Sequence, residues 1–415
     1  MIYDVEDKLK FPQLLVFGVQ LLLSVFVATV LIANICGVAS SGALIGAGCA
    51  TLLYVLITGF KSPMFISNSG NFVAPVLAAL AIAGYTGVAI GGVVTCLVYC
   101  LFGVIFSKVS VATVYKIFPK SLIGAVTAVI GIVLMGFIKT YIQIDGVVNM
   151  WGVSVAFVTM FAIALISHYA KGIAKILPFL LGLLIGYAYA CVITLTGVYQ
   201  IIDFSVFNNL SVFCVPDFAF MHWEPINVAS ILSIVVIYIA YSISAQMECL
   251  SDHAALGGII GRDLYITPGL GRIYIGEGVA NLASSFLGGL GCCSYGEGVS
   301  CVGYSKVASI YVTITAAVLL IILGFFAPLQ AFIASIPSCA FAGAAIILYG
   351  FIASSGIRML QKVDFNNQKN TIIVSSVLSL GISGIVVGGG SFSFTGTALA
   401  LIVGIILNLI LREDS

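Results

Sequence analysis

Four carboxylates lie within or beside long apolar runs of this chain, and they are the residues best suited to chemistry. They are Glu248, Asp252, Glu277 and Glu297. Glu248 and Asp252 stand four positions apart, so they share one face if the segment is helical. An acid inside an apolar helix costs on the order of 2.5–3.5 kcal/mol, which makes a functional role the default interpretation. No Lys or Arg is embedded with them to neutralise the charge.

Such carboxylates can do two things. When ionised, they accept hydrogen bonds from N–H groups of a ligand, and in an apolar setting one of them can bind and release a proton. We interpret Glu248 and Glu297 as ligand acceptors, and Glu248, Asp252 and Glu277 as the groups that handle a proton. The alternatives are that Glu297 only caps a helix N-terminus, and that Asp252 and Glu277 are solvated helix ends at the membrane surface. His253 is expected at that surface as well.

The composition excludes a soluble enzyme. Hydrophobic residues make up 61% of the 415 residues, charged residues only 7%, and the mean hydropathy is +1.22. A soluble domain carries about 25% charged residues, so most of this surface is expected to face lipid. The net charge is +1 and no basic run indicates a nucleic acid partner. The 11 cysteines are scattered without a metal-ligand spacing, so we expect small buried side chains and neither disulfides, a metal site nor a cofactor.

The apolar runs predict an all-α integral membrane protein with fourteen transmembrane segments. The first run lacks a signal-peptide cleavage site and is kept as a span. Two segments, 65–83 and 291–305, are interrupted by Gly, Ser and Pro, and each is expected to cross as a short strand followed by a half-helix. The other twelve are expected at 12–35, 40–58, 85–106, 121–138, 152–168, 174–196, 226–250, 273–290, 307–325, 338–353, 369–388 and 393–411.

The distribution of basic residues supports this count and an orientation. With fourteen crossings both termini are cytoplasmic, and every Lys and Arg from Lys8 to Arg412 falls in a cytoplasmic loop except Lys139. Positive charge concentrates on the cytoplasmic side of membrane proteins. We therefore predict a multi-pass protein of the cell membrane.

Fourteen segments divide into two repeats of seven, and the broken segment is third in each half. Repeats with an odd number of spans must be inverted relative to each other. Inverted repeats with paired broken helices are typical of secondary transporters, whose site lies at the midplane between the breaks. Both half-helices would begin there, and each would offer unpaired N–H groups and a partial positive charge.

Several motifs resemble the nucleobase–ascorbate transporter family. The segment 295–306, YGEGVSCVGYSK, is similar to the family signature, and 247–252 followed by 262–272 looks like its eighth span and the next loop. The regions around Gln20 and 349–358 resemble bacterial uracil permeases. The resemblance covers nearly the whole chain.

The resemblance implies two domains that move against each other. The core domain would comprise 1–110 and 226–326 (spans 1–4 and 8–11), and the gate domain 111–225 and 327–415 (spans 5–7 and 12–14). A nucleobase would bind between the breaks, and the implied substrate-binding residues are Glu248, Glu297, Gly296, Gly70 and Tyr295. Bacterial members are typically proton symporters and often homodimers.

The details of the pattern are mixed. Leu21 stands where a histidine is common, and Gly298, Ser300 and Ser305 replace the Asn, Gly and Thr of the signature. Glu297 resembles uracil permeases, whereas Asp252 and Glu277 resemble purine carriers. At the first break, Gly70 replaces the aromatic residue of uracil permeases and leaves more room.

We therefore predict a secondary active importer of a nucleobase, with uracil favoured over xanthine or another purine, and with proton rather than sodium symport. The first rival is an anion carrier of the sulfate-permease type, which shares the inverted-repeat architecture, although two acids in the site would repel an anion. A channel or a membrane scaffold, and a membrane enzyme, are weaker rivals because no charge ring, nucleophile–base pair or phosphate loop is present.

Overall fold

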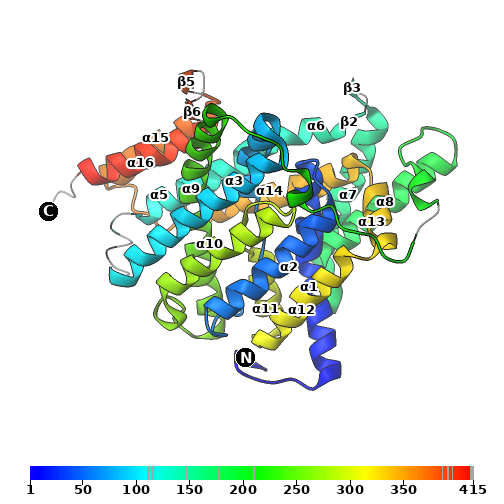
Figure 1. Cartoon of the computed structure of the whole chain (residues 1–415), viewed down its shortest axis with the longest axis horizontal. Helices are drawn as coiled ribbons and strands as arrows, with labels where there is room; N and C mark the ends of the chain where they lie inside the picture. Colours follow the sequence, from blue (N-terminus) through cyan, green and yellow to red (C-terminus); the bar gives the residue numbers. More distant parts are fainter. Residues whose placement is uncertain are drawn as a thin grey trace.

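A computed structural model describes the chain except residues 110–112, 114–115, 117, 145–146, 176, 209–210, 386, 390–391, 395 and 412–415. Arg412 therefore lies outside the described residues. Most of the described chain is helical (Figure 1). The main helices are α1 (Phe11–Ile35), α2 (Ser40–Ile57), α3 (Val73–Lys108), α5 (Lys120–Leu134), α6 (Ile138–Ile142), α7 (Met150–Tyr169), α8 (Pro178–Leu195), α9 (Val228–Ile260), α10 (Leu270–Phe286), α11 (Gly296–Ser305), α12 (Ile310–Gly324), α13 (Ala327–Ser335), α14 (Ser338–Leu360), α15 (Gln368–Ile382) and α16 (Gly396–Ile410).

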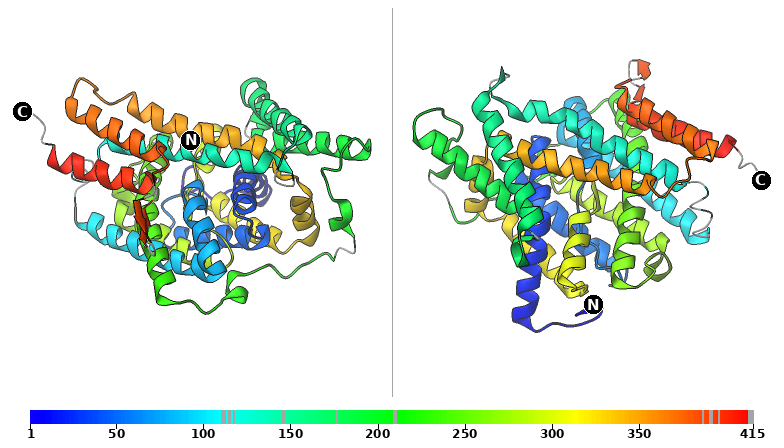
Figure 2. Two further views of the ribbon diagram at one scale, coloured as in Figure 1. Left: turned by 90° about the horizontal axis from the view of Figure 1, so that it is seen from above. Right: turned by 180° about the vertical axis from the view of Figure 1, so that it is seen from behind.

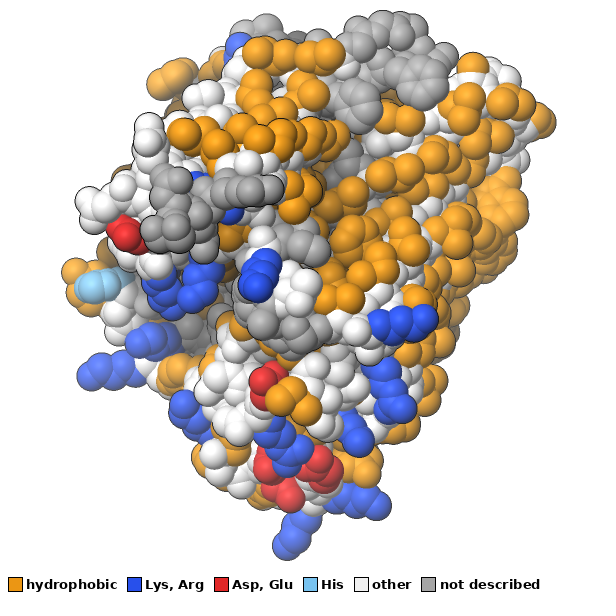
Figure 3. Space-filling model, turned by 90° about the vertical axis from the view of Figure 1, so that its left-hand side faces the viewer, with side chains coloured by type: hydrophobic (Ala, Val, Ile, Leu, Met, Phe, Trp, Pro, Cys, Tyr) orange, Lys and Arg blue, Asp and Glu red, His pale blue; other side chains and the backbone are white. Residues whose placement is uncertain are grey.

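The helices have the length and composition of membrane spans. Seven are long and apolar enough to cross a bilayer, among the described residues: α1, α2, the segment Gly70–Lys108, α7, α8, α9 and α14. Shorter apolar helices lie at Lys120–Leu134, Ile310–Gly324 and Leu399–Ile410. Figure 3 shows apolar side chains over the flank of the molecule, whereas Lys and Arg side chains gather toward one end. The expected multi-pass membrane protein is thereby supported, while the number of crossings stays a prediction.

Several boundaries differ from those expected. Helix α9 runs to Ile260, ten residues beyond the predicted end, and α15 already ends at Ile382. The short helix α13 was not expected. Two small hairpins were also missed; they are formed by β2 (Gln143–Ile144) with β3 (Val147–Val148) and by β5 (Val387–Gly389) with β6 (Phe392–Phe394). Hydropathy identifies only the apolar part of a helix. It does not detect polar turns that continue the helix, and such turns extend α9 to Ile260.

The expected boundary between the third and fourth segments is a sharp break inside α3. Ala83 and Gly84 leave the helical conformation, and Gly84 has a φ of +54°. A side chain at this φ is strained, whereas glycine adopts it readily. The break therefore divides α3 into a half-helix that follows the first broken segment and a second helix that ends at Lys108.

The two broken segments lie side by side as a small antiparallel sheet. Strand β1 (Ile66–Asn68) pairs with β4 (Cys292–Ser294), with Ile66 opposite Ser294. Each is followed by a helical segment: the short helix η1 (Gly70–Phe72) and α3 follow β1, and α11 follows β4. The strand-plus-half-helix form expected for 65–83 and 291–305 is therefore present in both.

Side chains satisfy the outer edges of this buried sheet. On the β1 side, Thr51 Oγ1 donates to the Ile66 carbonyl at 2.7 Å and accepts from the Ile66 N–H at 3.0 Å. On the β4 side, Asn281 does the same for Cys292, with both bonds at 2.6 Å. An unpaired backbone group in an apolar interior costs several kcal/mol. The buried side chains of Thr51 on α2 and Asn281 on α10 thus satisfy backbone groups that these buried strands would otherwise leave unpaired.

The helices pack as two groups. In the first, α10 packs on α3 and α2, α12 on α2 and α1, and α9 on α3. In the second, α14 packs on α5 and α7, α7 on α8, and α15 on α5 and α16. Figure 2 shows α14 and α5 running side by side along one side of the molecule. The first group contains both strands of the sheet.

The N-terminal segment is tied to the first group. The Ile2 N–H donates to the Lys306 carbonyl at 2.8 Å, and the Ala308 N–H donates to the Tyr3 carbonyl at 2.9 Å. Arg262, after α9, forms ion pairs with Asp4 at 2.7 Å and Glu6 at 2.6 Å. These hydrogen bonds lower the pKa of both carboxyls.

Candidate substrate cavity

A cavity of about 470 Å³ lies between the two helix groups. This volume is in the range of small-molecule sites. The first group contributes α1, the first break, α9 and α11, and the second group contributes α5, α8 and α14. The lining residues of the second group and its adjoining loop are Thr127, Lys175, Leu177, Pro178, Phe179, Leu180, Leu348, Phe351, Ile352 and Ser355. The wall from this side is therefore mostly apolar.

The first break positions a carboxylate. Ser69 Oγ donates to Glu248 Oε2 at 2.8 Å, and Asn71 Nδ2 donates to the same oxygen at 2.7 Å. Ser69 also caps η1, because its Oγ accepts from the Asn71 N–H at 3.2 Å. Glu248 is only partly buried and lines the cavity, as does Gly70. An ionised carboxylate has about four acceptor positions, so the two bonds orient Glu248 and leave it able to accept from a ligand.

The second break brings a second carboxylate to the same cavity. Tyr295, Gly296 and Glu297 all line it, at the start of α11. The first intrahelical bond there is from the Val299 N–H to the Tyr295 carbonyl, so the preceding N–H groups have no partner within the helix. The cavity therefore meets backbone donors and a carboxylate at one point.

Asp252 also lines the cavity, one turn after Glu248 on α9. Its Oδ1 lies 3.8 Å from the position that a Cβ on Gly296 would occupy. Its Oδ2 is buried and has no hydrogen-bond partner within the described part of the chain. A buried charged oxygen without a donor is costly, and uptake of a proton removes that cost.

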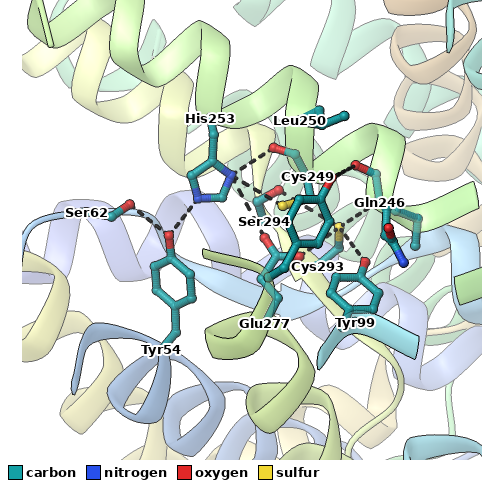
Figure 4. A network of polar contacts seen from close by, with 12 residues as sticks. Tyr54, Ser62, Tyr99, Gln246, Cys249, Leu250, His253, Glu277, Cys293 and Ser294 are labelled. Carbon is teal, nitrogen blue, oxygen red and sulfur yellow. Dashed lines mark hydrogen bonds and ion pairs between the residues drawn. The ribbon is translucent and has the colours of Figure 1, made fainter. Parts of the chain in front are cut away.

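Glu277 is separate from these residues. It has no exposed surface and is not part of the cavity wall; it lies on α10 in a buried polar cluster that also contains His253 (Figure 4). The alternative that Glu277 is a solvated helix end is wrong, and so is the expectation of an interfacial His253, which has 0% exposure. His253 follows Asp252 directly, so the rotation of α9 turns one toward the cavity and the other into the protein.

The structure brings six of the candidate residues to one cavity, and sequence reasoning missed two contributors to it and the buried position of His253. Glu248, Asp252, Gly70, Tyr295, Gly296 and Glu297 meet at one cavity. Ser69 and Asn71 were read only as part of a break, although polar side chains beside a broken span are the natural partners of an embedded acid. His253 was missed because one apolar helix turn does not reveal which of two adjacent polar residues faces inward.

The cavity reaches the surface beside Lys175 and Tyr304. Both residues line it and both are exposed, Tyr304 by 44%. Lys175 lies after α7, and Tyr304 lies near the end of α11. Both are on the side that the sequence predicts to face the cytoplasm.

The sequence of this chain is similar to those of known permeases. The model of a family described as "Permease family" matches residues 12–389. The uracil permease of Bacillus caldolyticus is 35% identical over 416 residues, which covers 99% of this chain and 94% of that protein. The uracil permease of Paenibacillus larvae is 32% identical and covers 98% and 96%.

A solved structure shares the fold. The transmembrane domain of a cyanobacterial bicarbonate transporter, BicA, superposes with a TM-score of 0.66 over 98% of this chain and 100% of that one, at 17% identity. The chain is a multi-pass membrane protein that belongs to the permease family.

Proposed function

We propose that this protein is a secondary active transporter that imports a nucleobase, with uracil as the favoured substrate, by proton symport with alternating access. One observation carries the proposal. Glu248, which the first break holds through Ser69 and Asn71, and Glu297, at the second break, line one cavity together with the backbone N–H groups at the start of α11 that have no partner within the helix. The relatives named uracil permease cover almost the whole chain.

A nucleobase matches this set of groups. Its ring edge presents neighbouring N–H donors and C=O acceptors. Carboxylates accept from the N–H groups, and helix N-terminal N–H groups donate to the carbonyls. Glu248 and Glu297 would accept from the base, while backbone groups near Gly296 and Gly70 would contact its oxygens and Tyr295 would bound the pocket.

Proton coupling is assigned to Asp252 together with Glu248, and Glu277 is retained as a further proton-binding group. Asp252 is favoured because it lines the cavity and has a buried oxygen without a donor among the described residues. A proton on Asp252 would reduce the repulsion among the three acids that line the cavity. Sodium symport is the alternative, since carboxylates and carbonyl groups at broken helices also suit that ion.

The architecture completes the proposal. We assign fourteen crossings in two inverted repeats of seven, with both termini in the cytoplasm, and a homodimer in the membrane. The core domain would be 1–110 with 226–326 and the gate domain 111–225 with 327–415. Support comes from the two groups of packed helices and from the strand–helix breaks that face each other across β1 and β4. Movement of one group against the other would open the cavity to either side.

An anion carrier is the main rival from another class, and the fold does not separate the two. The discriminating feature is charge. Three carboxylates line the cavity, and an anion beside them would be repelled, with Lys175 as the only cation among the described lining residues. A purine substrate is the rival within the same class, because Gly70 leaves space at the first break.

The test is the thermal stability of the detergent-purified protein in the presence of uracil, thymine, xanthine, urate, hypoxanthine, sulfate and bicarbonate. A ligand that binds only the folded state raises stability with the logarithm of its concentration. A selective increase with uracil supports the proposal. An increase with purines alone reassigns the substrate, and an increase with the anions alone contradicts the proposed role of the carboxylates.

A further inference from the structure

The buried cluster behind the cavity contains a thiol, an imidazole and a carboxylate at close range. Cys249 and His253 are one turn apart on α9, and Glu277 faces them from α10; one ligand atom from each lies within 4.8 Å of the other two (Figure 4). All three side chains are completely buried. We propose that they form a binding site for a divalent metal ion of the zinc type, which ties α9 to α10.

The spacing of the donor atoms suits such an ion. Cys249 Sγ lies 3.6 Å from His253 Nδ1, and Nδ1 lies 4.0 Å from Glu277 Oε1. In a tetrahedral zinc site with bonds of about 2.0–2.3 Å, neighbouring ligand atoms are about 3.3–3.8 Å apart. The Cys249–His253 distance already lies in this range, the His253–Glu277 distance is slightly longer, and the ligand atoms of all three residues lie within 4.8 Å of one another. Thiolate, imidazole and carboxylate together are ligands of zinc and not of magnesium or calcium.

A second observation, on the carboxylate of Glu277, also favours a cation. Glu277 Oε1 is buried and has no hydrogen-bond partner among the described residues. Among the described residues its one basic neighbour within 4.0 Å is the imidazole of His253, and no Lys or Arg forms an ion pair with it there. A buried carboxylate is stable only when it is paired, protonated or bound to a metal. This unpaired oxygen, Glu277 Oε1, belongs to a carboxylate of the proposed ligand set.

The structure also supplies the outer contacts that zinc-bound histidines need. Tyr54 O–H donates to Ser62 Oγ at 2.8 Å, so its oxygen is free to accept from His253 Nε2–H at 2.6 Å. The 2.8 Å contact of Nδ1 with the Cys249 carbonyl requires the ring proton on Nδ1, because a carbonyl only accepts. Metal binding would therefore move that proton to Nε2, which would donate to Tyr54, and leave the lone pair of Nδ1 for the metal. Metal-binding histidines characteristically donate their second N–H in this way. The ion would replace the 2.8 Å contact of Nδ1 with the Cys249 carbonyl.

Cys293 is the nearest source of a fourth ligand. It lies on β4, and its Sγ is 3.7 Å from Glu277 Oε2. With it the ion would connect α9, α10 and the second break. On binding, the cysteines lose their thiol protons to solvent, so affinity for the ion falls as the pH is lowered. The site does not contact the proposed substrate, and with the ion bound Glu277 would act as a ligand in place of a proton-binding group, which leaves coupling to Asp252 and Glu248. The expected role of the ion is to stiffen the group of helices that contains both breaks.

Cobalt(II) titration of the purified, chelator-treated protein without a histidine tag tests the site directly. We expect a sulfur-to-cobalt charge-transfer band that saturates at one ion per chain and disappears on addition of zinc. Zinc, and not magnesium, should also raise the thermal stability. Folded wild-type protein without a saturable band would overturn the proposal, whatever the variants do.

Matched cysteine variants locate the site. Cys249→Ser should weaken cobalt binding by more than about 100-fold, because even loss of an outer contact costs 10–100-fold. Cys292→Ser is the control, since this neighbouring buried thiol contacts the Leu290 carbonyl at 3.4 Å and does not belong to the cluster. Equal cobalt affinity in the two variants would overturn the assignment to Cys249. Retention of uracil binding in a protein without metal would leave the proposed function intact.

Discussion

The side-chain amide of Asn71 donates a 2.7 Å hydrogen bond to Glu248, which lies 177 residues later in the chain. Ser69 donates to the same oxygen. The first break thus provides both a helix start and the donors that orient a cavity carboxylate on α9. A binding group is thereby assembled from two distant segments, and its parts can be tested separately.

Replacement of Asn71 by leucine removes one donor and keeps the branched shape of the side chain. A hydrogen bond to a charged group contributes about 1.5–3 kcal/mol, so we expect the dissociation constant of uracil to rise about 10- to 100-fold. Equilibrium binding of radiolabelled uracil measures this. The control is Asn68→Leu: Asn68 accepts from the Leu290 N–H at 3.1 Å within the sheet, so its loss should lower thermal stability. Unchanged affinity in Asn71→Leu would show that Glu248 needs no orientation.

Glu297→Gln should abolish high-affinity uracil binding. The amide keeps the size of the side chain and loses the negative charge that accepts from two N–H groups. Thermal stabilisation by uracil is the measurement, and Glu224→Gln, which alters an exposed loop acid, is the matched control. If the Glu297 variant is stabilised as strongly as the wild type, Glu297 is only a helix cap.

Asp252→Asn should change the pH dependence of uptake. The carboxylate faces the cavity close to Glu248 and Glu297, so its proton would reduce the repulsion among three acids. Uptake into proteoliposomes between about pH 5 and pH 8 should depend on pH in the wild type and much less in the variant. If both proteins share one pH profile, Asp252 has a structural role and the coupling group lies elsewhere.

Gly70→Phe should narrow the cavity and sharpen its selectivity. A Cβ at this position would lie 3.3 Å from Leu134 Cδ1 and 3.7 Å from Ile352 Cδ1, so a ring would project between the two helix groups. We expect the affinity for xanthine and hypoxanthine to fall by more than the affinity for uracil. Competition by each base against labelled uracil measures these affinities. Gly70→Ala is the control, since one methyl group meets only flexible side-chain ends.

Arg262→Gln should weaken the attachment of the N-terminal segment in a pH-dependent way. Hydrogen bonds from Arg262 hold the pKa of Asp4 and Glu6 below their ordinary values. A lowered carboxyl pKa contributes stability above the ordinary value of about 4, and the contribution is lost as the pH falls through the lowered value. The side chains of Asp4 and Glu6 are 46% and 62% exposed, so the effect should be within about 1 kcal/mol.

Thermal unfolding at pH 7 and near pH 3 compares the wild type with Arg262→Gln. The difference in melting temperature should be present at pH 7 and smaller near pH 3. Arg358→Gln is the control, because Arg358 is exposed, and its effect on the melting temperature should not depend on pH. An equal loss at both pH values would mean that Arg262 acts through packing and not through its ion pairs.

The sequence by itself determined the membrane class and the position of both breaks. A charged fraction of 7% cannot cover a soluble surface, and Gly, Ser and Pro in the middle of an apolar run prevent a continuous helix. It also singled out Glu248 and Glu297 as candidate site residues, because an acid in an apolar segment stands out without knowledge of the fold. These are local properties, readable from a few consecutive residues.

The tertiary structure decided which of these residues meet. Asp252 and His253 are neighbours in the chain, yet one lines the cavity and the other is buried against Tyr54, and Glu277 faces His253 instead of the cavity. The rotation of α9 sets this division, and that rotation depends on packing against α3 and α11. The pairing of β1 with β4 joins segments more than 200 residues apart. Contacts at such separation arise from the fit of whole helices, which no local pattern of hydropathy records.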